Sequence, residues 1–394
     1  MAVKPHILFL PRWYPQHNDP MLGLFVKNLA ESLAPFCKIS VLHISAIAGQ
    51  SKPIVLDEKT EDGILTVSAS ISSRQRYLFQ RIVLAFRWIV AFQQCWKAIR
   101  KKQGTPDLAH VHVLTRPGIL ALWLKWFHGI PFIISEHWSR YFPENNQFKG
   151  FVRKVMTRHI LKQSCALICV SESLYSAMKK NGLTHAVKHT IPNVVNTQLF
   201  HPLAKKPKHD FYDVIHISCF EEQSKNITGL LKGMKIVCSM RNDVRLQLVG
   251  DGHDKSMVES LALELGLLPD VVVFRGTLLP VEVTGLLQQA DFLVQTSHYE
   301  TFGTVVAESL ACGVPVISTG VGIFPEIFTP KLGVLIRSTN DADIAEAILE
   351  AIGSISTFNS IAMRELAITH FSYENVGQRL FQIYQSHLKP LHRP

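Results

Sequence analysis

Short apolar runs alternate with longer helical patterns along nearly the whole chain. This alternation limits the possible folds more than any other feature of the sequence. In the first half the strand-like runs are HILFL (6–10), KISVLHI (38–44), LAHVHV (108–113), PFIIS (131–135) and ALICVS (166–171). In the second half they are DVIHIS (213–218), RLQLVG (245–250), VVVFRG (271–276), DFLVQT (291–296) and PVIST (315–319). Because strands that alternate with helices form parallel sheets, the sequence predicts an α/β protein with two doubly wound, Rossmann-like sheets.

The chain of 394 residues exceeds the roughly 100–200 residues of a usual single domain, which predicts two domains. HPLAKKPKHDF (201–211) is rich in Lys and Pro, lacks periodicity and is interpreted as a linker. We expect an N-terminal domain over 1–200, a second domain over 205–372, and a last helix over about 373–394 that crosses back. The carboxyl ends of both sheets would then meet at one cleft, where such sheets bind ligands.

The net charge of +10 belongs to one half of the chain. Residues 1–200 carry 25 Lys and Arg against 10 Asp and Glu, whereas residues 201–394 carry 16 against 21. The basic first half predicts an anionic partner, either a membrane face or a phosphorylated substrate. A content of 47% hydrophobic and 18% charged residues is that of a globular protein and excludes a mostly disordered one.

The seven cysteines are odd in number, lie in apolar contexts and include no CxxC pair. We interpret them as reduced thiols of a cytoplasmic protein and not as a disulfide framework or zinc site. The opening MAVKPHILFLPRWYP has too short an apolar run for a signal peptide, and no stretch reaches the ~18 uninterrupted apolar residues that span a bilayer. The expected location is the cytoplasm, soluble or peripheral on the inner face of the membrane.

The segment HYETFGTVVAESLACGVPVIST (298–319) carries two glutamates around a junction between a loop and a helix. DFLVQT predicts a strand before it, and TVVAESLAC predicts a helix that ends at Gly313. The backbone N–H groups of Phe302, Gly303 and Thr304 then lie at a helix N-terminus, which is an anion site. The missing side chain of Gly303 lets a phosphate approach the backbone.

Glu300 precedes this helix, and Glu308 lies about one turn inside it. Two interpretations fit their spacing. Both carboxylates can accept hydrogen bonds from the vicinal hydroxyls of a nucleotide sugar that lies between them. Alternatively, Glu300 only complements the helix dipole and Glu308 is solvated.

The residue pattern favours the first interpretation. The pattern E-x-F-G-x-x-x-x-E, followed by GVPVIS, resembles the nucleotide-sugar signature of retaining glycosyltransferases of family 4, which have the GT-B fold. Other segments resemble that family in the same order, so that the resemblance covers nearly the whole chain: LPRWYPQHNDPMLGLFVKNLAESL, IPNVVNTQLF, SKNITGLLKG, LQLVGDG and FRGTL.

The resemblance implies a function. Two Rossmann-like domains would face each other across a cleft and move a sugar, with retention, from a nucleoside diphosphate sugar to a glycan or lipid-linked acceptor. The donor would be UDP- or GDP-linked, no further cofactor would be needed, and the product would belong to polysaccharide or glycolipid biosynthesis. Departure and attack would occur on the same face of the sugar, with a diphosphate oxygen helping to deprotonate the acceptor.

The resemblance also implies roles for single residues. Glu300 would hold hydroxyls of the donor sugar, Glu308 would hold the ribose, and the backbone of Phe302, Gly303 and Thr304 would hold the diphosphate. Lys225 would neutralise the charge that builds on the leaving diphosphate, as a fixed cation can. Considered alone, Lys225 is a surface lysine.

Four more positions match the donor side. Arg275 and Gly276 would lie where the nucleobase packs, Gly23 would bring the loop after the first strand to donor and acceptor, and His137 would contact the donor sugar. Without the resemblance, Arg275 is a strand-end arginine, Gly23 is a turn glycine and His137 is a structural histidine. Acceptor choice would depend on first-domain loops around Gly23, Arg116, His137 and Arg140.

No metal site is expected. His110 and His112 alternate on one strand and so share a face, but no carboxylate or third His lies at a suitable spacing. The family implies metal-independent transfer.

Two departures from the family pattern bear on activity. Many members carry an Arg shortly before the phosphate-binding Lys, and Cys219 stands in that place, which means a relocated cation, weaker diphosphate binding or an inactive relative. The paired glycines ahead of a later Glu correspond to Gly322 and Ile323 before Glu326. The missing second glycine predicts a less open loop.

The stretch SRQRYLFQRIVLAFRWIVAFQQCWKAIRKK (73–102) is basic and aromatic. Such a helix can lie on an anionic bilayer with its rings at the headgroup level, or it can pack on the core with a solvated basic side. The basic first half favours the membrane. No nucleic-acid module is recognisable, and we expect no nucleic-acid partner.

Two other functions stay open. A GT-B epimerase or hydrolase would act on the nucleotide sugar without an acceptor. A non-catalytic, membrane-associated relative would explain Cys219.

Overall fold

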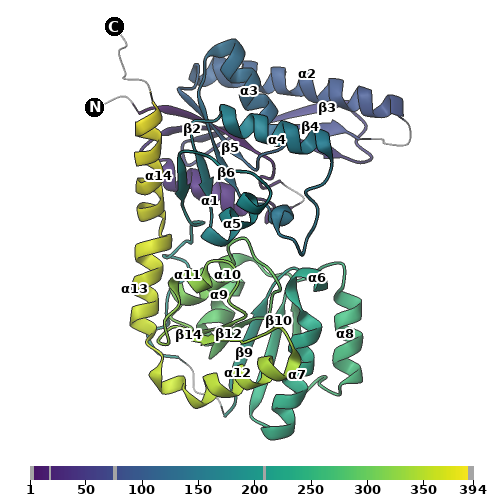
Figure 1. The fold of residues 1–394 in the computed structure, drawn as a ribbon, viewed down its shortest axis with the longest axis vertical. Coiled ribbons are helices and arrows are strands. Elements are labelled where there is room, and N and C mark those ends of the chain that lie inside the picture. The colour runs from purple at the N-terminus through teal and green to yellow at the C-terminus, as the bar shows by residue number, and fades with distance from the viewer. Residues whose placement is uncertain (1–3, 17–18, 74–77, 207–209, 389–394) are drawn as a thin grey trace.

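The computed structural model describes residues 4–16, 19–73, 78–206 and 210–388 (Figure 1). Residues 74–77 of the basic stretch and residues 389–394 of the expected last helix lie outside this part.

The first half of the chain folds around a sheet with the strand order β3-β4-β2-β1-β5-β6-β7-β8. Neighbouring strands are parallel except β3, which pairs with β4 in the antiparallel direction. The strands are β1 (His6–Pro11), β2 (Lys38–Ile47), β3 (Ile54–Glu61), β4 (Ile64–Ser72), β5 (Leu108–His112), β6 (Phe132–Glu136), β7 (Leu167–Cys169) and β8 (Lys188–Thr190).

The hairpin of β3 and β4 was not predicted from the sequence. Its turn is formed by Asp62 and Gly63, which have φ values of 49° and 79°. A two-residue turn with positive φ at both positions matches the twist of the flanking strands, and Asp-Gly is a usual pair there. The signal was therefore present, but it is weaker than that of the buried parallel strands because β3 is exposed along most of its length.

The second half folds around a parallel sheet with the order β11-β10-β9-β12-β13-β14. Its strands are β9 (Tyr212–Ile217), β10 (Val244–Val249), β11 (Val272–Gly276), β12 (Phe292–Gln295), β13 (Val316–Ser318) and β14 (Gly333–Leu335). The predicted fold class, two Rossmann-like sheets, is confirmed. The exact domain limits stay a prediction.

Helices cover both faces of each sheet (Figure 1). In the first half they are α1 (Leu24–Leu33), α2 (Leu78–Gln103), α3 (Arg116–His128), the short 3-10 turn η1 (Ser139–Tyr141), α4 (Phe151–Gln163) and α5 (Glu172–Lys180). In the second half they are α6 (Glu222–Lys225), α7 (Ile227–Met240), α8 (Lys255–Glu264), α9 (Pro280–Gln289), α10 (Thr304–Ala311), α11 (Phe324–Ile327), α12 (Asp341–Gly353), η2 (Ile355–Thr357), α13 (Ser360–Phe371) and α14 (Tyr373–His387).

The last two helices run along one side of the molecule from the second sheet to the first (Figure 1). Helix α13 packs on α10, and α14 packs on α1. Leu380 of α14 shares a buried cluster with Phe9 of β1 and Val26 of α1. The Tyr384 hydroxyl lies 2.7 Å from Nδ1 of buried His110, which ties this helix to the middle of the first sheet.

Helix α2 has two unlike sides. Its inner side contributes Ala91, Phe92, Cys95, Trp96 and Ile99 to the core. Its outer side exposes Ile82, Phe86 and Ile89, which recur at helical spacing. The window Ile82–Gln103 is long and apolar enough to cross a membrane by length and composition alone, and 28% of it is buried. Its inner contacts identify α2 as a covering helix of the first sheet with an apolar outer side.

Candidate active site

A cavity of about 460 Å³ lies between the two halves, at the carboxyl ends of their strands. Four of the predicted or questioned positions line it: Lys225, Glu300, His137 and Cys219. The other lining residues are Trp13, Trp138, Ser139, Glu221, Ser224, Tyr299 and Thr301. The segments after β1, β6, β9 and β12 therefore converge here, as expected for facing doubly wound sheets.

Lys225 and Glu300 form an ion pair in this cavity, with Nζ 2.5 Å from Oε1. The hydroxyl of Ser297 donates to the same carboxylate oxygen at 3.0 Å. Burial lowers the pKa of Lys225, but the nearby Glu300 carboxylate more than offsets this, so that the net shift is upward. Lys225 therefore stays a cation at neutral pH.

The end of β12 fixes the position of Lys225. The Thr296 hydroxyl donates to the Lys225 carbonyl at 3.0 Å. The N–H of His298 donates to the Ser224 carbonyl at 2.9 Å. Lys225 and Glu300, 75 positions apart in sequence, are thus held together by both backbone and side-chain contacts.

The loop after Glu300 leads into α10. Gly303 has a φ of 80° and begins this helix. Within the described residues, the N–H groups of Gly303, Thr304 and Val305 donate to no protein acceptor, as is usual for the first turn of a helix. Gly303 and Thr304 belong to the anion site predicted with Phe302, which stays a prediction. The ring of Phe302 is buried and packs edge-on against Phe371, with the centroids 5.7 Å apart.

Glu308 lies one turn into α10 and is partly buried. Among the described residues its carboxylate has no hydrogen-bond or ion-pair partner. Burial raises its pKa to about 7. A partly buried carboxylate without a protein partner is suited to accept hydrogen bonds from ligand hydroxyls.

His137 is partly buried beside His112, with a ring-nitrogen separation of 3.4 Å. Its ring packs against Phe25 in a tilted arrangement, with the centroids 4.6 Å apart. Burial lowers its pKa to about 3, so the imidazole is neutral at physiological pH. His110 bonds to Tyr384 and Ser135 and is structural. No group of three or more His, Cys, Asp and Glu side chains in the described part of the chain is arranged to hold a metal ion.

Arg275 and Gly276 lie apart from this cavity. Strand β11 is at the sheet edge, and Arg275 Nε donates to Gln247 Oε1 at 2.8 Å. Gln247 in turn donates to Asp213 at 2.5 Å. The predicted contact of Arg275 and Gly276 with a nucleobase stays a prediction.

Gly23 begins α1 with a φ of 70°. A Cβ there would lie 2.3 Å from the carbonyl oxygen of Trp13, so only glycine permits the observed approach of α1 to the loop after β1. The glycine thereby helps to position Trp13 at the cavity. Direct contact of Gly23 with donor and acceptor stays a prediction.

Arg116 is exposed at the start of α3, and Arg140 is buried in η1. Two residues that the sequence pattern did not single out, Arg12 and Trp138, lie beside Arg140, and Trp138 lines the cavity. The guanidinium carbon of Arg12 lies 4.3 Å from the Trp138 ring centroid, and that of Arg140 lies 3.3 Å from it. The position of Arg12 directly after an apolar strand, in LPRW, was the available signal for a residue at a sheet's carboxyl edge.

The turn with the replaced glycine supports the same loop. The N–H of Ile323 donates to the Phe302 carbonyl at 2.8 Å, and Ile323 is buried. Glu326 accepts from the N–H of Glu172 at 2.7 Å, at the first turn of α5. The Ser171 hydroxyl donates to the Thr301 carbonyl at 2.6 Å. The first half of the chain therefore holds the Glu300 loop directly.

Comparison with known proteins gives the family. Residues 202–355 match the model described as glycosyl transferases group 1, and residues 23–199 match that of glycosyltransferase family 4. The chain is 29% identical over 223 residues to a phosphatidylinositol N-acetylglucosaminyltransferase protein of Arabidopsis thaliana, a match that covers 56% of this chain and 49% of that protein. It thus spans about half the length of that relative. It is 26% identical over 300 residues to alpha-monoglucosyldiacylglycerol synthase of Streptococcus pneumoniae, covering 72% of this chain and 67% of the synthase.

Solved structures show a shared fold. A sucrose-phosphate synthase from Thermosynechococcus elongatus superposes with a TM-score of 0.77 at 19% identity, over 98% of this chain and 99% of that one. Anabaena HepE, solved with UDP and glucose, superposes with a TM-score of 0.70 at 15% identity, over 97% and 100%. Since the two family models together match most of the chain and the two-sheet fold is shared, the protein belongs to glycosyltransferase family 4 and has the GT-B fold.

Proposed function

We propose that this glycosyltransferase moves a sugar from a UDP- or GDP-linked donor to a lipid-linked or glycan acceptor, with retention and without a catalytic metal. The observation that carries the proposal is the Lys225–Glu300 ion pair in the cavity between the two sheets. On donor binding, Glu300 would exchange its bond to Lys225 for sugar hydroxyls, and Lys225 would turn to the diphosphate. A fixed cation stabilises the leaving group where a metal would otherwise be needed.

Three further features support this assignment. The unpaired N–H groups at the start of α10 suit a diphosphate, and Glu308 without a protein partner suits a ribose. HepE was solved with UDP and glucose, which supports a UDP-linked donor. The Arabidopsis and Streptococcus relatives are named for lipid acceptors, which supports a lipid-linked one.

We also propose that the protein works at the inner face of the membrane, in glycolipid or polysaccharide biosynthesis. The exposed Ile82, Phe86 and Ile89 on the outer side of α2 support this, together with the basic end of that helix, Arg100 to Lys102. A helix with apolar and basic exposed residues binds an anionic bilayer surface.

A thermal-shift screen with UDP-glucose, UDP-N-acetylglucosamine, GDP-mannose and ADP-glucose tests the donor. One UDP- or GDP-sugar should raise the Tm, because a ligand at 100 times its Kd adds about 2.7 kcal/mol to the free energy of unfolding. Chelation with EDTA should leave the shift unchanged. If none of the four donors raises the Tm, the non-catalytic alternative replaces the proposal.

The stabilising donor is then incubated with and without a bacterial lipid extract. Transfer requires donor consumption that depends on the extract, and NMR of the product should show the anomeric configuration of the donor. Equal consumption without extract would identify a hydrolase or epimerase, and an inverted product would exclude retention.

A further inference from the structure

An apolar cavity of about 890 Å³ lies beside the active-site cavity, beneath α2 and α3. Leu42, Ile44 and Ala46 of β2 give it one apolar side, because alternate strand side chains share a face, and His43 and Ser45 of the same strand also line it. Leu84 and Trp88 of α2 close one side. Cavities of roughly 300–1,000 Å³ hold small ligands, and the apolar residues that line this one suit a hydrocarbon chain.

Two arginines, Arg12 and Arg116, line the same cavity, and Trp13 lines both it and the active-site cavity. Arg140 lies close to Arg12, because both contact the ring of Trp138. Their guanidinium carbons lie 3.3 Å and 4.3 Å from the ring centroid, respectively. Arg12, Arg116 and Arg140 form an arginine cluster. It lies where the apolar cavity adjoins the active-site cavity.

The cluster lacks anionic partners. Arg140 is 3% exposed, and its Nε and Nη2 atoms, like Nε of Arg12, are buried without a hydrogen bond. Among the described residues no carboxylate forms an ion pair with Arg12, Arg116 or Arg140. Burial, then the charges of Arg140 and Arg116, lowers the pKa of Arg12 to about 10. Arg140 is buried, Arg12 is partly buried and donates to the Thr115 hydroxyl at 3.2 Å, and Arg116 is exposed. Burial of a cation without an anionic partner is costly, and a ligand anion would relieve that cost for Arg140 and Arg12.

Glu136, a buried carboxylate whose charge acts on Arg12 and Arg140, already has hydrogen-bond donors of its own. It accepts hydrogen bonds from the N–H groups of Leu114, His137 and Trp138 and from the hydroxyl of Tyr141, at 2.9 to 3.1 Å. It orders the segment that carries Trp138 and Arg140. Its charge acts on Arg12 and Arg140, but it forms no ion pair with either of them.

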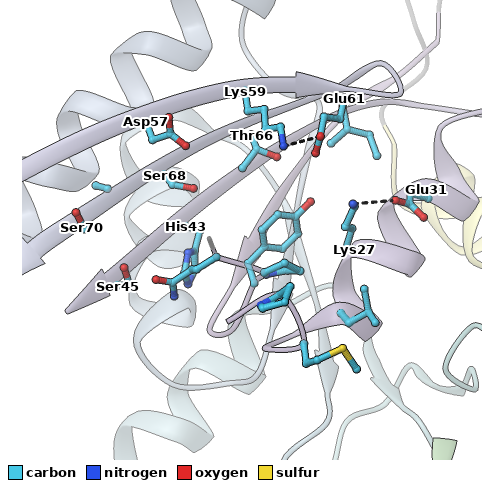
Figure 2. A pocket seen from close by; sticks show the side chains of 18 of the residues that line it. Lys27, Glu31, His43, Ser45, Asp57, Lys59, Glu61, Thr66, Ser68 and Ser70 are labelled. Atoms are coloured by element: carbon cyan, nitrogen blue, oxygen red, sulfur yellow. Dashed lines mark ion pairs between the residues drawn. The ribbon is translucent and has the colours of Figure 1, made fainter. Parts of the chain in front are cut away.

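The opposite face of the same sheet offers a contrast (Figure 2). Another cavity there, of about 850 Å³, is lined by both apolar and polar side chains, and the polar ones include Thr66, Ser68 and Ser70 of β4. Its lysines are paired, Lys27 with Glu31 at 3.6 Å and Lys59 with Glu61 at 2.5 Å (Figure 2). Of the two cavities, the apolar one beneath α2 therefore has the unneutralised cations.

We propose that Arg12, Arg116 and Arg140 bind a phosphate group of the acceptor and that the adjoining apolar cavity holds the hydrocarbon chain of the same molecule. The acceptor is then a lipid-linked phosphate. This inference rests on the proposed transferase function and narrows its acceptor class. Ile89 and Ile119 line the cavity and are exposed, and Phe86 continues this apolar surface along α2, which gives the chain a route towards a bilayer.

The experiment measures binding without any donor, by quenching of tryptophan fluorescence, since Trp13 and Trp88 line the cavity. The probes are farnesyl phosphate, farnesol and inorganic phosphate. Farnesyl phosphate should bind at least tenfold more tightly than either of the others. Arg12→Gln and Arg116→Gln should each weaken farnesyl phosphate binding at least fivefold and leave farnesol binding unchanged.

Ile89→Asp, on the exposed side of α2, should weaken farnesyl phosphate binding without affecting inorganic phosphate. Arg337→Gln is the matched control, because Arg337 is an exposed arginine of the second half and should have no effect. Arg140→Gln removes a buried charge and should also weaken farnesyl phosphate binding. If this variant does not fold, the Arg116→Gln variant tests the same site at an exposed position. Equal affinity for farnesol and farnesyl phosphate, or unaltered binding in both Arg12→Gln and Arg116→Gln, would overturn the proposal.

The two proposals fail separately. Lys225→Gln changes the donor side and should leave farnesyl phosphate binding intact. If the protein binds no nucleotide sugar but its binding of farnesyl phosphate still depends on Arg12, the proposed transferase function is wrong and the lipid-phosphate site is retained. If sugar is transferred equally well to phosphate-free acceptors, the function stands and the phosphate site is overturned.

Discussion

At the scale of single residues, the two glutamates of the signature differ in what surrounds them. Glu300 is paired with Lys225 and bonded to Ser297, whereas Glu308 has no partner among the described residues and a pKa of about 7. The pair keeps a cation at the cavity before any donor arrives. The unpaired carboxylate carries the cost of its own burial, which a ligand hydroxyl would offset.

Replacing Lys225 by Gln should lower kcat about 10²- to 10³-fold, because a fixed charge at the leaving group is lost. Initial rates with the donor found by thermal shift check this. Lys232→Gln is the control, since Lys232 is an exposed lysine of the following helix. A Lys225→Gln enzyme with a kcat within threefold of the native value would remove Lys225 from the chemistry.

Glu308 should make stability depend on pH. Its pKa is raised from 4.5 to about 7 in the folded protein, so folding favours the protonated form. The stabilisation is complete below pH 4.5 and is lost as the pH rises through 7, by up to about 3 kcal/mol. Glu308→Gln should match the native protein at pH 5 and exceed its free energy of unfolding at pH 8, measured by urea denaturation. A difference between the two proteins that does not change with pH would contradict the burial of this carboxylate.

At the scale of elements, the loop between β12 and α10 is held from two directions. Ser171 donates to Thr301 from the first half, and the turn after β13 donates to Phe302 through Ile323. Gly322 lets this turn approach, because a Cβ there would lie 2.4 Å from the Phe302 carbonyl oxygen and 3.1 Å from Cβ of Glu300. The carboxylate is thus positioned by packing around its loop.

Gly322→Ala should lower the free energy of unfolding by about 2–4 kcal/mol and weaken donor binding, because it adds a clash to an unfavourable positive φ of 70°. Gly320→Ala is a matched control. Its φ is 69°, but its Cβ would meet only Leu335 at 3.4 Å, so the cost should be about 1 kcal/mol. Urea denaturation of both variants measures the difference, and equal losses would show that the clash is relieved without cost.

At the scale of the whole molecule, the outer side of α2 and the apolar cavity beneath it lie on the same side of the first sheet. A membrane-bound acceptor would reach the active site without leaving the bilayer surface if α2 faced that surface. The basic first half of the chain would add electrostatic attraction to anionic lipid.

Phe86→Glu should reduce binding to phosphatidylglycerol vesicles at least fivefold, because Phe86 is 66% exposed and a carboxylate there is repelled by the anionic surface. Vesicle co-sedimentation measures this, with phosphatidylcholine vesicles and 0.5 M salt as weak-binding conditions. Leu263→Glu on α8, at a position that is 68% exposed, should change nothing. If both variants sediment like the native protein, α2 does not contact the membrane.

The α/β class and the pattern that identifies the family can be predicted from the amino-acid sequence, because both depend on residues close together in the chain. The strand runs, the helix after Gly303 and the E-x-F-G-x-x-x-x-E pattern are each complete within about 20 residues. Lys225 and Glu300 could be named for the same reason, through the segments around them.

Which of these groups have partners depends on the folded chain. Tyr384 meets His110 across 274 positions, Ser171 meets Thr301 across 130, and Arg12 and Arg140 share one tryptophan ring. Burial, ion pairing and pKa shifts depend on distances between segments that are remote in sequence, and local patterns carry no record of those distances. For this reason the unpaired arginines and the cavity beside them emerged only from the folded chain.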